Sequence, residues 1–287
     1  MANLKEIRNR ITSIKSTMQI TSAMKMVSAA KLKKAQDAIV AMRPYSSKLT
    51  ELLQNLSATL DSDSGGDYSV QREVNKVLLV VVTSNRGLCG GFNSSITKTV
   101  TRRIAEKYAD KQVDLFAIGK KGGDVLSKTR KVVENRNDIY DDLNFDNVAE
   151  IAEHLMDLYV SGSYDKIELV YNQFKNAATQ LPQVEQFLPI KPIEGGDVNA
   201  NSDYIFEPTK EEIVLALIPK SLKTQLYKAI RDSFASEHGA RMTAMHKATD
   251  NAKDLRDDLL LTYNKARQAA ITNEILEIVG GAEALKN

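Results

Sequence analysis

The chain lacks the residues on which several classes of protein depend. Among its 287 residues there is one cysteine, Cys89, and no tryptophan, and aromatic residues make up only 6%. A single cysteine excludes an intramolecular disulfide and any zinc site built on two cysteines, and it is typical of a reducing compartment. The scarcity of aromatic residues argues against a stacking platform for single-stranded nucleic acid.

Long apolar runs are also missing. The longest, Val77 to Val82, has the length of a strand, far below the roughly 18 residues of a membrane span. The N-terminal residues MANLKEIRNR lack the apolar core of a secretory signal. With 43% hydrophobic and 26% charged residues and a formal net charge of +2, the composition is that of an ordinary globular protein. We therefore expect a cytosol-facing chain without direct membrane insertion.

Proline and polar residues divide the chain into three blocks. We expect a helical block over residues 1–60, an α/β block over 67–208 and a second helical block over 209–287. Four of the six prolines lie in the middle block, and none follows Pro219. The polar stretch 61–67, DSDSGGD, is typical of a flexible joint.

The first block has the periodicity of a long helix. Twelve positions follow one another at steps of three and four, the seam of a heptad repeat, and nine of them are apolar. They are Leu4, Ile7, Ile11, Ile14, Met18, Thr21, Lys25, Ser28, Leu32, Ala35, Ile39 and Met42. Between Thr21 and Ser28 the apolar residues Ile20, Met24 and Val27 lie one position earlier. We expect the seam to loosen there, so that an apolar strip with Met24 faces another partner.

The third block repeats this pattern over ten positions. They are Met245, Ala248, Ala252, Leu255, Leu259, Thr262, Ala266, Ala269, Asn273 and Leu276. A helix from Lys220 to the C-terminus would be roughly 100 Å long, and the first helix is expected to end or kink at Pro44. Helices of this length need a partner along them. We therefore expect the two chain ends to pair as a long antiparallel coiled coil, with the middle block inserted between them.

Apolar runs alternate with helical stretches in the middle block. The pattern predicts strands at Val74–Thr83, Val113–Gly119 and Lys166–Phe174, with edge strands at Gln183–Ile190 and Tyr204–Phe206. It predicts helices at Phe92–Ala109, Gly122–Lys128 and Asp146–Val160. Such alternation is typical of right-handed βαβ crossovers, so the expected fold is a Rossmann-like α/β domain with a mostly parallel sheet.

A glycine-rich turn, residues 83–92 (TSNRGLCGGF), follows the first strand and opens a helix, where phosphate-binding loops lie. Its spacing fits neither Gly-x-Gly-x-x-Gly nor Gly-x-x-x-x-Gly-Lys-Ser/Thr. The next strand is followed by Gly119-Lys120-Lys121 in place of a ribose-binding acid. Over a nucleotide site we favour a tight turn with positive φ angles or a docking surface for another subunit, with Arg86, Gly87, Gly90 and Gly91 as its candidate residues.

The remaining polar residues form no catalytic constellation. His154, His238 and His246 have no metal-binding spacing, which favours solvated helix residues over metal ligands. Cys89 has no identifiable histidine partner, which favours a small, partly buried thiol. We therefore expect no catalytic residue, no metal and no cofactor in this chain.

The composition of the two ends of the chain predicts that both contact other molecules. Residues 1–43 carry nine Lys or Arg residues against Glu6 and Asp37, which favours an acidic partner surface, with nucleic acid as the competing interpretation. Residues 271–281 (ITNEILEIVGG) have apolar side chains both on and off the seam. A helix end that is apolar nearly all round must be enclosed, and we expect other subunits to form a hydrophobic sleeve around it.

Five segments resemble the gamma subunit of F-type ATP synthases. They are residues 7–11 (IRNRI), 19–29 (QITSAMKMVSA), 85–93 (NRGLCGGFN), 236–245 (SEHGARMTAM) and, most specifically, 263–282 (YNKARQAAITNEILEIVGGA). The matches fall in all three blocks and in the family's order, so the resemblance covers the whole chain.

The resemblance implies a central rotor shaft without catalytic residues, one copy per complex, inside a hexamer of alpha and beta subunits. Its other partners would be the epsilon subunit and the subunits of a membrane rotor ring, with no nucleic acid. The paired helices would form the shaft and the α/β block its foot. Rotation of the shaft would couple proton flow through the ring to ATP synthesis or hydrolysis.

The resemblance also assigns residues by position. Met24 and Lys25 would pass the acidic lever loops of the beta subunits. The contact surface within the hexamer would include Arg241, Arg267, Gln268 and Thr272, and the apolar bearing would include Ile275, Ile278 and Val279. Lys25 stands where some relatives carry an acid, so contact with the acidic loops is expected to be more attractive here.

The sequence also departs from some branches of that family. It has no counterpart of the regulatory insertion of chloroplast gamma subunits, with its cysteine pair, so thiol control of rotation is not expected. No transit peptide is recognisable, which points to a bacterial protein held peripherally at the cytoplasmic face of the plasma membrane. Two rival functions are a dinucleotide-binding enzyme and a coiled-coil adaptor for nucleic acid, and neither explains the apolar helix end.

Overall fold

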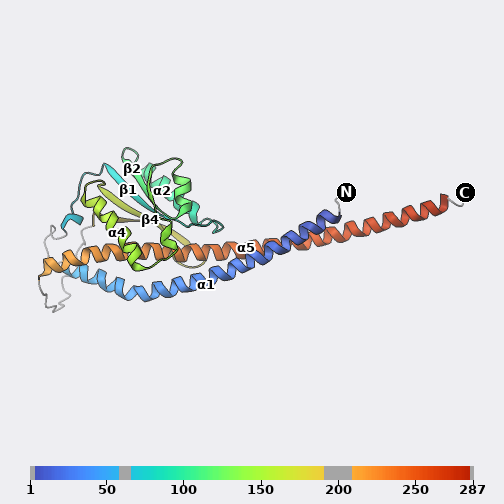
Figure 1. Ribbon diagram of the computed structural model, residues 1–287, viewed down its shortest axis with the longest axis horizontal. Helices are drawn as coiled ribbons and strands as arrows, with labels where there is room; N and C mark the ends of the chain where they lie inside the picture. The colour runs from blue at the N-terminus through green and yellow to red at the C-terminus, as the bar shows by residue number, and fades with distance from the viewer. Residues whose placement is uncertain (1–3, 58–65, 191–208, 285–287) are drawn as a thin grey trace. The chain divides into compact units, whose positions relative to one another are not determined.

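The computed structural model describes residues 4–57, 66–190 and 209–284 (Figure 1). The contacts divide the chain into a helical unit, residues 1–28 with 242–287, and an α/β unit, residues 29–241. Helix α1 (Leu4–Ser57) and helix α5 (Lys210–Ala284) each contribute to both units. Among the described residues, no helix is both long and apolar enough to cross a membrane.

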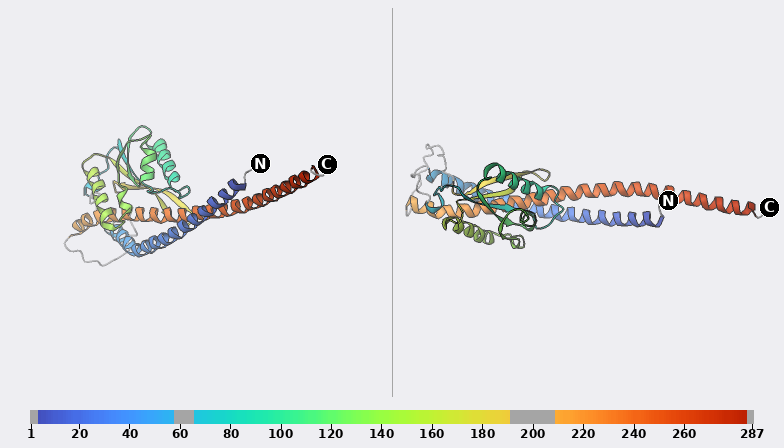
Figure 2. Two further views of the ribbon diagram at one scale, coloured as in Figure 1. Left: turned by 45° about the vertical axis from the view of Figure 1, so that its right-hand side comes forward. Right: turned by 90° about the horizontal axis from the view of Figure 1, so that it is seen from above.

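The helical unit is an antiparallel pair of helices (Figures 1 and 2). Arg8 Nη2 donates a hydrogen bond to the hydroxyl of Tyr263 at 2.8 Å, and the hydroxyls of Thr21 and Thr249 hydrogen-bond at 2.8 Å. Moving up α1 from Arg8 to Thr21 therefore means moving down α5 from Tyr263 to Thr249. The predicted pairing of the chain ends in an antiparallel coiled coil is confirmed.

The predicted seam of α1 stays on its less exposed face along the whole pattern. Thr21 and Ser28 are buried, whereas Ile20 and Val27 are exposed. The expectation that the seam loosens there is wrong, because hydrogen bonds satisfy both buried hydroxyls. Ser28 Oγ donates to the carbonyl of Met24 at 2.7 Å, and Thr21 forms the hydrogen bond across the pair. Of the apolar strip beside the seam, Ile20 and Val27 are exposed and Met24 is half-buried, and its contact with another partner stays a prediction.

The predicted seam of α5 holds from Met245 to Ala252 and again at Leu259 and Ala266, but it fails at two positions between them. Leu255 and Thr262 are exposed, and Arg256 and Tyr263 lie on the less exposed face in their place. Long side chains with an apolar stem or ring cover a partner helix while their polar ends reach its edge. Tyr263 does this, since its hydroxyl accepts the hydrogen bond from α1.

Both long helices continue through a proline. Pro44 lies inside α1 and Pro219 inside α5, which begins at Lys210, ten residues before the predicted start at Lys220. Pro44 therefore does not end the first helix. A proline removes the backbone hydrogen bond to the residue four positions earlier. For Pro44 that residue is Val40, which is exposed, so water can satisfy the freed carbonyl.

A five-stranded sheet forms the centre of the α/β unit, in the order β3-β2-β1-β4-β5. Strands β1 to β4 are parallel to one another, and β5 is an edge strand that pairs antiparallel with β4. The strands are β1 (Lys76–Val82), β2 (Gln112–Ile118), β3 (Val132–Asn135), β4 (Lys166–Phe174) and β5 (Gln180–Leu188). The sequence missed β3, whose four residues include no apolar run, and the predicted strand Tyr204–Phe206 lies outside the described residues.

Helices cover both faces of this sheet (Figures 1 and 2). They are α2 (Phe92–Lys107), α3 (Lys120–Leu126), α4 (Phe145–Val160) and the first part of α5, with short 3-10 turns at Gly66–Tyr68 and Asp138–Tyr140. Alternate residues of β1 pack against α2 on one face and against α4 and α5 on the other. Burial on both faces explains why β1 is a continuous apolar run in the sequence. The Rossmann-like α/β fold is confirmed.

A buried carboxylate ties α2 to the sheet. Glu168 on β4 is 1% exposed and accepts hydrogen bonds from Arg103 Nε at 2.9 Å, Arg103 Nη2 at 2.7 Å and the Tyr108 hydroxyl at 2.7 Å. Burial by itself raises the pKa of Glu168, but these hydrogen bonds and the charges of Arg103 and Lys166 outweigh it and lower the pKa below 4.5. The folded protein therefore favours the ionised carboxylate.

The substitution Glu168→Gln is expected to lower the free energy of unfolding by about 3 kcal/mol at pH 7, because it leaves Arg103 without its counter-charge. The folded-state pKa lies below the unfolded one, so the carboxylate's contribution is complete above pH 4.5 and is lost as the pH falls below it. Denaturant unfolding at several pH values should show the difference from the native chain shrinking in acid. The exposed Glu106→Gln is the control, and an equal loss at every pH would contradict this account.

Candidate functional site

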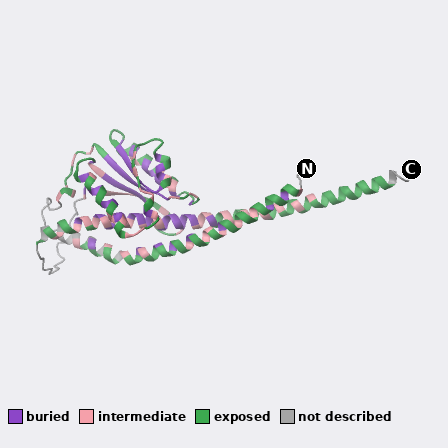
Figure 3. Ribbon diagram, in the orientation of Figure 1, coloured by how far each residue is buried: buried purple, intermediate pink, exposed green. Residues whose placement is uncertain are grey.

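The C-terminal part of α5 is exposed on every side. From Arg267 to Ala282 each described residue is exposed (Figure 3). Five large aliphatic side chains lie in this segment, with exposed fractions between 49% and 66%: Ile271, Ile275, Leu276, Ile278 and Val279. A soluble protein rarely leaves such a group uncovered unless it is an interaction surface.

The described part of α1, which begins at Leu4, reaches only the beginning of this segment. Arg8 pairs with Tyr263 in the antiparallel arrangement, so Leu4 lies level with α5 about one helical turn beyond Tyr263. From there α5 continues to Ala284, a further length of roughly 25 Å. Within the described part of the chain, nothing packs along that length.

The residues assigned by resemblance fall partly on this segment. Arg267, Gln268 and Thr272 are exposed on it, in the same run of helix as the five apolar side chains. On α1, Met24 and Lys25 are half-buried, next to the exposed Met26. All of these residues belong to the helical unit.

The turn between β1 and α2 has the strained geometry that its glycines suggested. Gly90 has φ +57°, and Leu88 has φ +62° although it is not a glycine. Gly87 and Gly91 do not have positive φ angles. The turn exposes Arg86 and places Leu88 with 66% of its surface in solvent.

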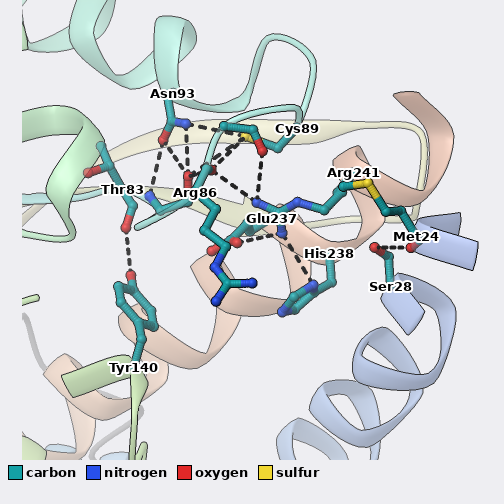
Figure 4. A network of polar contacts seen from close by, with 12 residues as sticks. Met24, Ser28, Thr83, Arg86, Cys89, Asn93, Tyr140, Glu237, His238 and Arg241 are labelled. Atoms are coloured by element: carbon teal, nitrogen blue, oxygen red, sulfur yellow. Dashed lines mark hydrogen bonds and ion pairs between the residues drawn. The ribbon is translucent and has the colours of Figure 1, made fainter. Parts of the chain in front are cut away.

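Asn93, at the start of α2, holds the turn together (Figure 4). Its Oδ1 accepts from the backbone N–H of Ser84 at 3.1 Å, and its Nδ2 donates to Ser84 Oγ at 2.8 Å and to Cys89 Sγ at 3.2 Å. Cys89 is buried, and burial raises the pKa of its thiol. The expected buried thiol is confirmed, and its environment does not favour a nucleophilic thiolate.

Arg241 braces the turn from α5 (Figure 4). Its Nη1 donates to Glu237 Oε1 at 2.6 Å, and its Nη2 donates to the carbonyls of Arg86 at 3.0 Å and Gly87 at 3.3 Å. Arg241 is only 7% exposed. Its expected place on the contact surface is therefore wrong: the guanidinium is directed at the chain's own turn. The one signal in the sequence is the Glu-Arg spacing of four, which places both side chains on one face of a helix.

His238 is also part of this buried cluster. It is 5% exposed, and its ring lies edge-on to Phe234 with the centroids 4.5 Å apart. Burial and the charges of Arg241 and Lys31 lower its pKa to about 3, so the ring is neutral. The expectation that His238 is solvated is wrong, whereas His154 and His246 are exposed as predicted.

The chemistry of the turn does not suit a phosphate. Phosphate-binding loops present backbone N–H groups to the ligand, but Arg86 and Gly87 present carbonyls here, and Arg241 already binds them. The carboxyl group of Glu237 lies beside the same guanidinium. Burial raises the pKa of this carboxyl group, and the charge of Arg241 offsets part of that rise. Among the described residues there is also no group of three or more His, Cys, Asp or Glu residues that could hold a metal.

Comparison with known proteins agrees with this geometry. The model of the ATP synthase family matches residues 3–285. The gamma chain of Flavobacterium psychrophilum ATP synthase is 74% identical over 286 residues, covering 100% of both chains. The chain belongs to the ATP synthase gamma-chain family. The gamma chain of a Geobacter species is 46% identical over 287 residues, again with 100% of both chains covered.

Solved structures show the same family architecture. The central stalk of the Tetrahymena thermophila mitochondrial ATP synthase superposes with a TM-score of 0.60 and 26% identity, over 80% of this chain and 99% of that one. The rotor of the Euglena gracilis mitochondrial enzyme superposes with a TM-score of 0.69 and 23% identity, over 93% and 98%. As a gamma chain, this protein is a subunit of the central stalk of an ATP synthase.

Replacing Gly90 by alanine is expected to cost about 1–2 kcal/mol of stability, because a Cβ disfavours the left-handed conformation. Gly87→Ala is the matched control, since Gly87 has no positive φ and an added Cβ would only touch Lys121 Cε at 4.0 Å. Thermal unfolding of both variants measures the difference. Equal midpoints for the two variants would mean that the turn relaxes without needing this backbone conformation.

Proposed function

We propose that this gamma chain is the rotor shaft of an ion-driven ATP synthase and carries no catalytic residue itself. Its task is mechanical: it couples proton flow through a membrane rotor ring to ATP synthesis or hydrolysis in a hexamer of alpha and beta subunits. One copy stands in each complex. The α/β unit is the foot that joins the epsilon subunit and the ring at the cytoplasmic face of the bacterial plasma membrane.

The uncovered apolar end of α5 is the observation that carries this proposal. Each large aliphatic side chain moved out of water contributes about 1.5–3 kcal/mol, so Ile275, Ile278 and their neighbours favour enclosure strongly. At 100° per residue these side chains spread over roughly 160° of the helix circumference, a face too broad for a flat surface to cover completely. A collar of alpha and beta subunits around the helix covers all sides and still permits rotation, since apolar contacts are not directional.

The other expected contact residues suit a shaft that makes polar contacts with the hexamer next to its apolar end. Arg267, Gln268 and Thr272 are exposed hydrogen-bonding groups preceding the apolar end, suited to contacts with the hexamer. Met24 and Lys25, beside the exposed apolar strip, are suited to the acidic lever loops of the beta subunits, where a positive charge is attracted. Arg241 is left out of this surface because it is buried.

A single asymmetric shaft inside a ring of three otherwise equivalent catalytic sites makes the three sites differ from one another. One asymmetric helix pair cannot present the same face to three catalytic sites at once, so its angle biases each site toward a different conformation. Turning the shaft then moves each site through binding, reaction and release. The chain contributes stiffness and shape to this cycle, and no bond chemistry.

Removing residues 267–287 from the chain in the assembled complex tests the proposal. We expect ATP hydrolysis to continue with poor ion pumping, because the shaft no longer reaches its bearing. Hydrolysis is measured as phosphate release, and pumping as ATP-driven quenching of a pH-sensitive dye in membrane vesicles. Fully retained coupling between the two would overturn the proposed function. A tagged full-length chain should also retrieve two larger subunits in excess over itself.

A charge in the bearing tests the apolar collar more directly. Ile278→Asp is expected to weaken retention of the shaft in the hexamer by about 100-fold to 4,000-fold, since an unpaired carboxylate buried in an apolar site costs about 3–5 kcal/mol. Asn273→Asp introduces the same charge at an exposed polar position of the same helix and should have little effect. Retention is measured by dilution of the purified complex. Equal weakening by both variants would argue for a general charge effect and against a collar.

A further inference from the structure

The α/β unit has the crevice in which folds of this kind bind ligands. Strands β2 and β3 extend the sheet on one side of β1, and β4 and β5 on the other. The chain therefore reverses its direction of winding between β1 and β4. In open α/β sheets, ligands bind beyond the carboxyl ends of the strands at this switch point.

In this chain helix α5 occupies that position. On the β4 side, Ser236 Oγ donates to the carbonyl of Asn172 at 3.1 Å. On the β1 side, Arg241 donates to the carbonyls of Arg86 and Gly87. Two successive turns of one helix thus bind the ends of both strands that flank the switch point.

The fit between α5 and this crevice leaves no spare room. A Cβ on Gly239 would approach Ala177 Cα to 3.1 Å and the Ala177 carbonyl oxygen to 3.2 Å, so the helix and the β4–β5 turn are in close contact. One residue further, Ala240 packs with Cys89 and Phe92. Small residues on α5 therefore allow backbone-level contact where a ligand would otherwise lie.

The Arg241 brace differs from these packing contacts in being directional. Apolar surfaces slide past one another at little cost. A planar guanidinium that bonds two carbonyls and a carboxylate is satisfied in one orientation only. Because the group is buried, water cannot replace bonds that break when α5 turns or slides.

We propose that the ligand crevice of this sheet serves as the grip of the α/β unit on α5, and that Arg241 is the positioning residue that prevents α5 from slipping in it. The grip transmits torque between the foot and the shaft. This inference rests on the proposed rotor function. It assigns the glycine-rich turn a role inside the chain: its carbonyls receive the guanidinium that locks the helix.

The test compares Arg241→Lys with Arg256→Lys in the assembled complex. Lysine keeps the charge but cannot bond both carbonyls and Glu237 in a planar fork. Arg256 lies on the same helix, and its side chain binds only the neighbouring Asp257 among the bonds the structure describes. For Arg241→Lys we expect amide hydrogen exchange of residues 84–92 to rise at least tenfold, with exchange of residues 220–232 unchanged. For Arg256→Lys we expect no change in either.

The functional readout is the number of ions pumped per ATP hydrolysed, measured in vesicles against a rising ion gradient. We expect Arg241→Lys to keep the hydrolysis rate and to lose at least half of this ratio under load. Glu237→Gln, which keeps the two carbonyl bonds, should lose less, and it provides the measurement should Arg241→Lys fail to assemble. Faster exchange of residues 84–92 together with an unchanged number of ions pumped per ATP would overturn the inference. Unchanged exchange of these residues in Arg241→Lys would overturn it as well.

The two levels of the proposal can fail separately. If removal of residues 267–287 uncouples the complex and the Arg241 and Glu237 variants do not, the grip is wrong and the rotor function stands. If that removal leaves coupling intact, the rotor function itself is wrong, whatever the variants do.

Discussion

The pairing of the two chain ends is the constraint on which the rest of this gamma chain depends. Neither helix has a continuous apolar seam, and the pair is completed by polar residues that satisfy one another, such as Thr21 with Thr249 and Arg8 with Tyr263. These bonds fix the register of the two helices, which apolar side chains by themselves specify weakly. The register in turn decides which part of α5 the described part of α1 covers.

Exposure and burial therefore give one helix two different kinds of contact surface. Toward its C-terminus α5 is exposed on all sides and carries a broad apolar face, which under the proposed function lies within a collar. Between Ser236 and Arg241 the same helix is buried, with Ser236 bonded to the sheet and Arg241 bonded to the turn. Non-directional contacts permit rotation, and directional buried contacts resist it. The proposed rotor function would use the first kind of contact toward the hexamer and the second toward the α/β unit of the same chain.

The sequence predicted the helices and strands whose residue pattern is local. It failed to predict the burial of individual side chains where packing against a distant segment determines it. The burial of β1 on two faces is visible as VNKVLLVVVT, and the heptad steps of α1 as repeated Ile and Leu. His238 looked like a solvated helix residue, because nothing in SEHGAR says which face of that helix meets the sheet. Leu255 looked like a seam residue, yet Arg256 and Tyr263 take that face once a real partner helix lies beside them.

By itself, the sequence determined the two long helices, the mostly parallel sheet between them and the apolar helix end, because periodicity and composition act through neighbouring residues. Only the tertiary structure determined that Arg241 is buried and which groups it binds. Its partners are Glu237, one helical turn away, and the carbonyls of Arg86 and Gly87, more than 150 residues earlier in the chain. Backbone carbonyls are present at every residue, so no sequence pattern marks which of them a buried guanidinium will bind, and only the folded chain brings them within reach.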